Sequence, residues 1–231
     1  MKQHIGHISH VSRRIVGRIL GLSAIVMLCS VAVAGTSGCA LTSKADVANI
    51  RYFSPEVVRP RLTGADGSAP GPATGAVEVR LGRVSSGPNL RERIAYRDAA
   101  YELGYYADWR WTERPETFVR RELGRTLYEG HGFHRVLGGA APTLDVEVIA
   151  FDDLRLPTGR AARVQLKVIL FEDAGVVFED TITVDRPVPG GAPKIEDVVA
   201  AMATALELAS EQAANRIGSE LGKRATAKRG N

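Results

Sequence analysis

Three long runs in which apolar and polar side chains alternate constrain the fold of this chain most. They span residues 143–154, 161–173 and 176–188, and a period of two residues is typical of a strand with one buried face. Ala174 and Gly175, preceded by Asp173, join the last two runs, which predicts a tight antiparallel hairpin. Residues 195–221 follow with an apolar stripe at helical spacing, so we expect a long amphipathic helix.

Shorter elements precede these runs. Pro115 suits a first helical turn, and apolar residues recur at helical spacing from Phe118 to Tyr128, before Gly130 and Gly132. The order of strands, helix, strands and helix predicts an α+β fold, with two helices packed on one face of a mainly antiparallel sheet in a single domain. Further strands are expected at 50–55, 76–84, 92–98, 101–111 and 132–139.

The composition also divides the chain into segments. Residues 39–49 are polar and predict a flexible tether, and residues 50–223 form the expected domain. Within it, residues 63–75 are rich in Gly, Pro and Ala, which is typical of a loop. Residues 224–231 are basic and predict a disordered tail.

Residues 1–38 have the organisation of a secretory signal peptide. Lys2, Arg13, Arg14 and Arg18 precede an uncharged apolar run at 19–34, and small residues follow it. A transmembrane anchor is the alternative interpretation. Crossing the hydrocarbon core takes about 20 apolar residues, and this run is shorter and contains Ser, Gly and Ala.

Two cleavage sites compete at the end of this leader. Residues 32–34 (AVA) fit an ordinary signal peptidase. The sequence GTSGC (35–39) resembles a bacterial lipobox, in which cleavage directly precedes Cys39 and that cysteine is acylated, although Thr36 stands where Leu is usual. The other cysteine, Cys29, lies in the apolar run, so Cys39 has no disulfide partner in the domain. We therefore predict that Cys39 is lipidated. A cysteine that carries two or three acyl chains would meet the requirement of stable anchoring for more than one chain.

The charge balance of the mature chain argues against a nucleic-acid partner. The leader holds four of the 30 basic residues and no acidic residue, so 26 basic residues remain beside 26 acidic ones. A neutral chain lacks the basic surface that phosphate backbones require. No cysteine follows Cys39, which excludes a thiolate zinc site in the domain.

A search for catalytic motifs finds no P-loop, HExxH or GxSxG sequence. His131 and His134 flank Gly132, and we interpret them as part of a surface turn rather than a metal site. Asp152 and Asp153 are adjacent on a predicted strand and should point to opposite faces. We interpret them as a loop-edge pair exposed to water, and we predict neither a cofactor nor catalysis.

An aromatic stretch, residues 103–115, is the remaining candidate for a binding surface. Tyr105, Trp109 and Trp111 should share one face of a strand and pack in the core under the following helix. Alternatively, Tyr106, Trp109 and Trp111 form a surface that contacts a partner or lipid, because Trp and Tyr are enriched at interfaces.

The order of these features is that of a known family. The order begins with a lipobox-like cysteine, which is followed by a short strand with Tyr52 and Phe53 and by an aromatic stretch before a Pro-led helix. An Asp-Val-Glu-Val strand, a hairpin and a long Ala-rich helix come next. This order resembles the ABC-type transport auxiliary lipoprotein family over residues 50–221. The resemblance is most specific over residues 105–123, where Trp111 matches the tryptophan before the first helix and Leu123 lies on that helix's apolar face.

The resemblance implies a non-catalytic periplasmic domain tethered to the outer membrane. It implies as partners an inner-membrane ABC permease, its ATPase and a mammalian-cell-entry (MCE) domain protein, which together move lipids between membranes. Ala40 after the cysteine implies the outer membrane, by resemblance to lipoproteins of enteric bacteria. Two alternatives stay open: a pilotin-like or polysaccharide-export assembly lipoprotein, and a secreted enzyme of unknown chemistry. Direct lipid binding by this chain also stays open.

The prediction of lipidation is tested by metabolic labelling. Cells that express the wild-type chain should incorporate labelled palmitate into it, and the Cys39→Ser variant should incorporate none, because the thiol is the acyl acceptor. A wild-type chain that never labels, or a variant that still labels, would contradict the assignment.

Overall fold

The structure is a computed structural model that describes residues 49–56, 77–99, 101–157, 159–173, 175–190 and 194–229. These residues belong to one unit, Asn49–Asn231. The leader, Cys39 and the predicted loop at 63–75 lie outside the described residues.

A mixed eight-stranded sheet is built around β6, which pairs with three other strands. One edge of β6 pairs antiparallel with β7, which in turn pairs antiparallel with β8. The other edge is divided, because its first part pairs in parallel with β2 and its second part in parallel with β3. The strands are β1 (Arg51–Phe53), β2 (Glu78–Ser86), β3 (Arg93–Ala99), β4 (Glu102–Trp111), β5 (His134–Arg135), β6 (Thr143–Leu156), β7 (Gly159–Glu172) and β8 (Gly175–Pro187).

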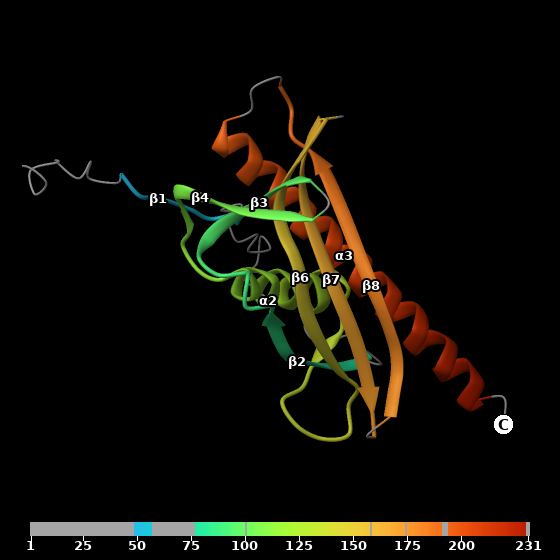
Figure 1. Cartoon of the computed structure of the whole chain (residues 1–231). Coiled ribbons are helices and arrows are strands. Elements are labelled where there is room, and N and C mark those ends of the chain that lie inside the picture. The colour runs from blue at the N-terminus through green and yellow to red at the C-terminus, as the bar shows by residue number, and fades with distance from the viewer. Residues whose placement is uncertain are drawn as a thin grey trace, which may run out of the picture. The chain divides into compact units, whose positions relative to one another are not determined.

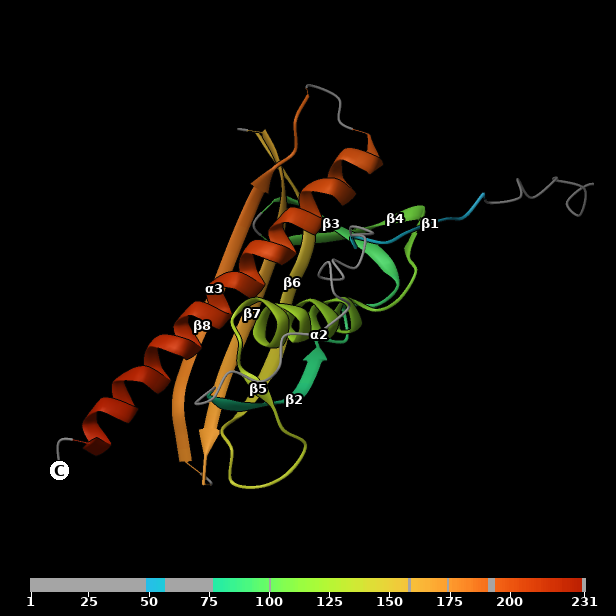
Figure 2. The same ribbon diagram turned by 180° about the vertical axis from the view of Figure 1, so that it is seen from behind.

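Two helices lie on one face of this sheet, behind it in Figure 1 and in front of it in Figure 2. Helix α2 (Pro115–Arg125) packs on β2 and β6 and continues into one π-helical turn, η1 (Thr126–Gly130). Helix α3 (Ile195–Arg229) packs on β7 and β8. The predicted α+β class, with two helices on one face, is therefore confirmed.

The core forms where the alternating strands meet the helical stripes. Alternate residues of β7, from Ala162 to Leu170, are buried on the helix face. The stripe of α3 packs on them, and alanines in it let the helix approach the sheet closely. The buried residues of α3 include Ile195, Val198, Met202, Ala205, Leu206, Ala209, Ala213 and Ile217.

Strand pairing differs from the expected pattern in one respect. The hairpin of β7 and β8 is confirmed, and Asp173 has a left-handed φ of 51° at its turn, a conformation that Asp tolerates better than most residues. However, β2 and β3 join β6 in parallel. The longest pairings are antiparallel, whereas the shorter parallel ones depend on crossovers that local periodicity cannot reveal.

Helix α3 is longer than its apolar stripe predicts. It runs to Arg229, so residues 224–229 are helical, whereas the sequence indicated a disordered tail from 224. Arg224 forms an ion pair with Glu172 at the end of β7, and Lys223 pairs with Glu220 one turn earlier. These contacts support the helix beyond Leu221, although isolated surface pairs contribute little each.

A single inserted residue changes which side chains of β6 face the helices. The register between β6 and β7 shifts between Val148 and Ala150, which leaves Ile149 as the extra residue of a β-bulge. Val148 and Phe151 are both buried in the core, although three positions separate them. After the bulge, Phe151 and Asp153 therefore face the helices, and Asp152 faces the opposite side.

Trp111 provides a test of this packing. Only 1% of its surface is exposed, and its ring meets the rings of Phe118 and Phe151 edge to face, with centroids 6.2 and 5.4 Å apart. Trp111→Ala should lower the free energy of unfolding by about 3–5 kcal/mol, because it leaves a cavity in the core. Urea unfolding followed by circular dichroism measures this change.

The fully exposed Tyr101 provides the matched control. Tyr101→Ala should change the free energy of unfolding by no more than about 0.5 kcal/mol. Equal effects of the two substitutions would contradict the assigned core.

Candidate functional site

A buried carboxylate organises the end of the sheet where β3, β4, β6 and β7 meet. Asp153 on β6 is fully buried. Arg160 on β7 donates from Nε to Oδ1 at 2.9 Å and from Nη2 to Oδ2 at 2.6 Å. The Tyr106 hydroxyl on β4 donates to Oδ2 at 2.5 Å, and Arg155 Nε lies 3.5 Å from the same oxygen. Both carboxylate oxygens are thus satisfied, as a buried charge requires.

Two aromatic rings extend this cluster to the surface. The Arg155 guanidinium lies 3.7 Å from the ring centre of Tyr96 and 4.7 Å from that of Tyr106, a cation–π arrangement. Gly104 is the cross-strand partner of Tyr96. A Cβ atom at position 104 would lie 2.4 Å from Tyr96 Cζ, so the ring occupies space that only glycine leaves free.

Burial and charge act together on the Tyr106 hydroxyl. Burial, followed by the hydrogen bond to Asp153, raises the pKa of Tyr106 to about 12. Hydrogen bonding to Asp153 also raises the pKa of the Arg160 guanidinium above its ordinary value. The cluster therefore holds its protons firmly, so it suits a structural role better than proton transfer at neutral pH.

The structure separates the aromatic residues that the sequence grouped together. Trp111 lies in the core, so its interpretation as a surface contact is wrong for this conformation, and its core assignment is confirmed. Trp109 is partly buried against the core, and its ring centre lies 4.2 Å from that of Tyr106. Of the three proposed contact residues, Tyr106 and Trp109 remain partly accessible at one place.

Tyr105 does not share the core face with Trp109 and Trp111, contrary to the prediction. Its hydroxyl donates to the Asn89 carbonyl at 2.9 Å, and Arg93 lies over its ring. The cause is an irregular register between β3 and β4, where Ala95 pairs with Tyr105 but Arg93 pairs with residue 110. Four residues of β4 therefore lie opposite one residue of β3, and simple alternation fails there.

The aspartate pair is buried, so its interpretation as an exposed loop-edge pair is wrong. Asp152 and Asp153 both lie inside β6 with no exposed surface. They do have separate partners, as their adjacent positions on a strand predict, because Asp152 Oδ2 accepts a hydrogen bond from Arg97 Nε at 2.5 Å. Two acidic residues within the otherwise apolar segment 148–154 of β6 were the available signal for this burial.

The two histidines among the described residues, His131 and His134, lie after η1. His131 Nε2 lies 2.7 Å from Glu211 Oε2 on α3, a contact between residues 80 positions apart. His134 is more exposed, and its Nδ1 lies 3.8 Å from Glu78 Oε1. Within the described ranges, no three His, Cys, Asp or Glu side chains are grouped closely enough to hold a metal ion.

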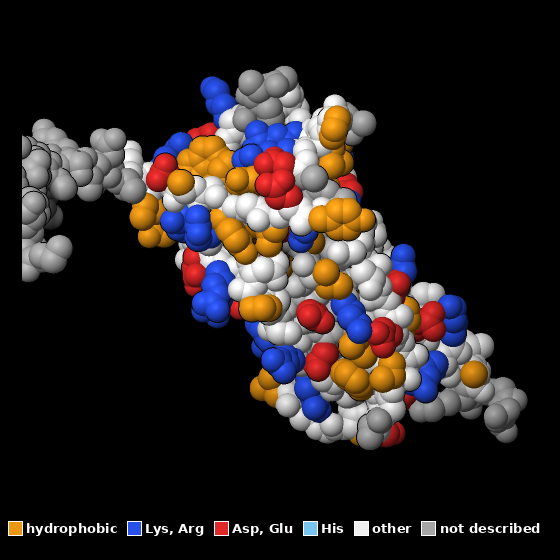
Figure 3. Space-filling model, in the orientation of Figure 1, with side chains coloured by type: hydrophobic (Ala, Val, Ile, Leu, Met, Phe, Trp, Pro, Cys, Tyr) orange, Lys and Arg blue, Asp and Glu red, His pale blue; other side chains and the backbone are white. Residues whose placement is uncertain are grey.

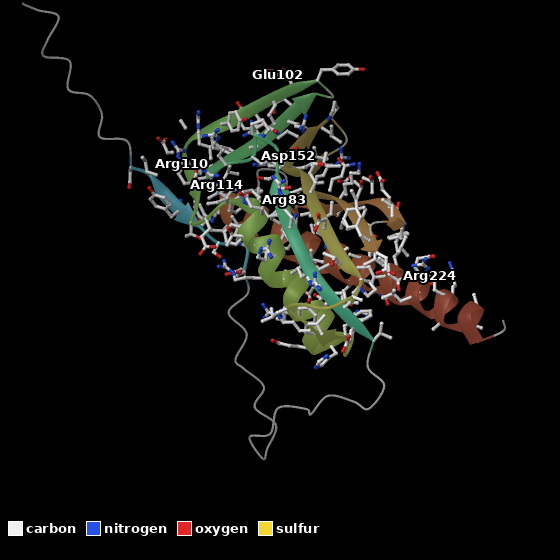
Figure 4. The ribbon with its side chains drawn as sticks, turned by 90° about the horizontal axis from the view of Figure 1, so that it is seen from below. Arg83, Glu102, Arg110, Arg114, Asp152 and Arg224 are labelled. Atoms are coloured by element: carbon white, nitrogen blue, oxygen red, sulfur yellow. The ribbon has the colours of Figure 1, made fainter. Side chains whose placement is uncertain are left out.

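The end of the predicted tether meets the sheet at β1. This strand pairs in parallel with the end of β4, and Arg51 forms an ion pair with Glu196 in the first turn of α3. Figure 4 shows Arg110 and Arg114 beside β1.

In the part of the chain that the structure describes, no helix is long and apolar enough to span a bilayer.

Comparison with known proteins identifies the family. Residues 61–214 match the ABC-type transport auxiliary lipoprotein component family. The chain belongs to this family. The match covers the sheet from before β2 through β8, α2 and most of α3, so the architecture described above is that of a transport auxiliary lipoprotein domain.

Two solved structures share the fold of this auxiliary lipoprotein. Protein XCC0632 from Xanthomonas campestris superposes with a TM-score of 0.62 at 18% identity, over 76% of this chain and 99% of that one. An uncharacterized protein superposes with a TM-score of 0.52 at 15% identity, over 62% of this chain and 94% of that one. No curated protein matches the chain.

The raised pKa of Tyr106 predicts a distinct alkaline titration. In the folded protein, the absorbance of tyrosinate near 295 nm should include one component with a midpoint near pH 12. Tyr106→Phe should remove this component, and Tyr101→Phe should leave it in place. A wild-type titration without it would contradict the assigned burial of the hydroxyl.

The same shift gives stability a pH dependence. Because the folded pKa of about 12 lies above the ordinary tyrosine value near 10, the contribution of Tyr106 to stability is complete below about pH 10 and is lost as pH rises toward 12. Over that range, wild type should lose more stability in urea unfolding than Tyr106→Phe does.

Proposed function

We propose that this protein is a non-catalytic outer-membrane accessory subunit of an ABC transport system that moves lipids between membranes with an MCE-domain protein. The observation that carries the proposal is the family match over residues 61–214. The lipobox-like sequence at 35–39 precedes this domain and supports an acyl anchor on Cys39.

The length of the segment between Cys39 and the domain suits this role. Residues 40–49 would reach about 35 Å if fully extended, which is enough to hold the domain clear of the bilayer surface. The tether joins the domain at the short strand β1. Ala40 supports transfer of the acylated chain to the outer membrane.

The arrangement of the charged side chains favours a role without catalysis. Asp153 has both oxygens occupied by Arg160 and Tyr106, and Asp152 is held by Arg97. Both carboxylates are fully buried and hydrogen-bonded to an arginine, whereas a general base must be accessible to its substrate. A subunit of this kind would act by binding its membrane, its lipid or its protein partners.

Affinity purification of the tagged chain from its native cells tests the proposal. Mild crosslinking followed by mass spectrometry should recover an MCE-domain protein, an ABC permease and its ATPase, and membrane fractionation should place the chain with the outer membrane. Cys39→Ser is the control, because it should lose outer-membrane fractionation while its domain still folds.

Two results would contradict the proposal. Recovery of secretin or polysaccharide-export components instead would favour an assembly lipoprotein. Acylated chain that fractionates with the inner membrane would contradict the location, even if the transporter subunits are recovered.

A further inference from the structure

A hollow of about 410 Å³ lies on the face of the sheet opposite the helices. Figure 3 shows this face, on which hydrophobic side chains lie among charged ones. We call it the Asp152 hollow, after the buried aspartate that lies between the lining residues Ala150 and Leu154 on β6. Its lining includes Arg97, Ile149, Leu154, Leu156, Arg163 and Gln165.

Asp152 has one oxygen without a partner. It is fully buried, and Oδ1 has no hydrogen-bond partner among the described residues, whereas Oδ2 accepts from Arg97. Ala150 and Leu154, two positions before and after it, line the hollow, so strand alternation directs Asp152 toward the same space. A buried acceptor without a donor is costly and rare, which points to a donor from outside the chain.

Arginines lie on either side of this carboxylate, and each has guanidinium N–H groups that are not used in its ion pair with an aspartate. Arg97 uses Nε for Asp152. Arg163, the cross-strand partner of Asp152, uses Nε and Nη2 for Asp185 at 2.7 Å each. A guanidinium has five N–H donors, so each arginine keeps donors for an anion. Both side chains are partly exposed, so a change of rotamer would uncover Oδ1.

Apolar side chains lie at the rim of the same hollow. Ile149 is 38% exposed and Leu156 is 43% exposed, although both are large aliphatic residues on a central strand. Ile149 is the bulged residue, and Leu156 ends β6. An aliphatic chain laid along this rim would remove their surfaces from water, which is favourable.

We propose that the Asp152 hollow binds a phospholipid whose headgroup carries both a phosphate and a primary ammonium group, as in phosphatidylethanolamine. The phosphate contacts Arg97 and Arg163, because guanidinium N–H groups match phosphate oxygens. The ammonium donates to Asp152 Oδ1, and one acyl chain lies along Ile149 and Leu156. This inference rests on the proposed function in lipid transport and names its lipid class and binding site.

The primary ammonium is the discriminating feature of this ligand. Oδ1 needs an N–H or O–H donor, and the quaternary ammonium of phosphatidylcholine has none. The site should therefore prefer phosphatidylethanolamine over phosphatidylcholine by about tenfold, the scale expected for one charged hydrogen bond.

Photocrosslinking of the purified acylated protein tests the proposal. The probes are phosphatidylethanolamine and phosphatidylcholine that each carry a diazirine in one acyl chain, presented in dodecyl maltoside micelles. The ethanolamine probe should label residues of β6 between 149 and 156, as mapped by mass spectrometry, about tenfold more than the choline probe.

Three variants separate binding from folding. Asp152→Asn should reduce the preference for ethanolamine, because the amide oxygen accepts a hydrogen bond without the negative charge. Leu156→Lys changes a partly exposed residue, so the fold should persist while labelling falls about fivefold. Lys167→Gln removes a cation from the same face of β7, where Lys167 pairs with Glu179 outside the hollow, and should label as wild type does.

The outcomes that overturn the proposal are distinct. Equal labelling by the two probes, labelling mapped outside β6, or a folded Leu156→Lys variant that labels like wild type would each reject it. Free phosphoethanolamine should compete only weakly, and full competition by it would indicate a site for a small soluble zwitterion instead. Lipid labelling is independent of subunit recovery, so failure here and failure of the transporter assignment are distinguishable.

Discussion

The extra residue that Ile149 adds to β6 determines the character of both faces of the sheet around it. Before the bulge, β6 presents Val148 to the helices, and after it the strand presents Phe151 and Asp153 to that same side. Without the inserted residue, Asp152 would point toward the core and Asp153 away from it. The central aromatic packing, the buried ion cluster and the hollow on the outer face all depend on this one shift in register.

The two neighbouring aspartates show how differently a buried charge can be accommodated. Asp153 receives hydrogen bonds from Arg160 and Tyr106 and is completely satisfied. Such a cluster orients the β3–β4 hairpin over β6, because loss of one partner would leave an uncompensated charge in the interior. Asp152 receives only the bond from Arg97. The contrast between a complete and an incomplete site supports a structural role for the first and a binding role for the second.

An auxiliary lipoprotein that binds lipid on its sheet would have a clear division of labour within one small domain. The helices and the core maintain the sheet, and β1 connects the sheet to the tether. Among the described residues, both helices lie on one face of the sheet, and the opposite face carries the hollow (Figures 1 and 2).

The sequence by itself determined the features that depend on near neighbours. The stripe of α3, the hairpin at Asp173 and the start of α2 at Pro115 follow from periodicity and turn chemistry, which act over a few residues. The predictions of a signal peptide and of lipidation at Cys39 rest on the sequence alone. Only the tertiary structure decided the parallel pairing of β2 and β3 with β6, the contact of His131 with Glu211, and the burial of Asp152 and Asp153. These depend on strand register and on partners far away in the chain, and a one-residue shift in register exchanges the two faces of a strand.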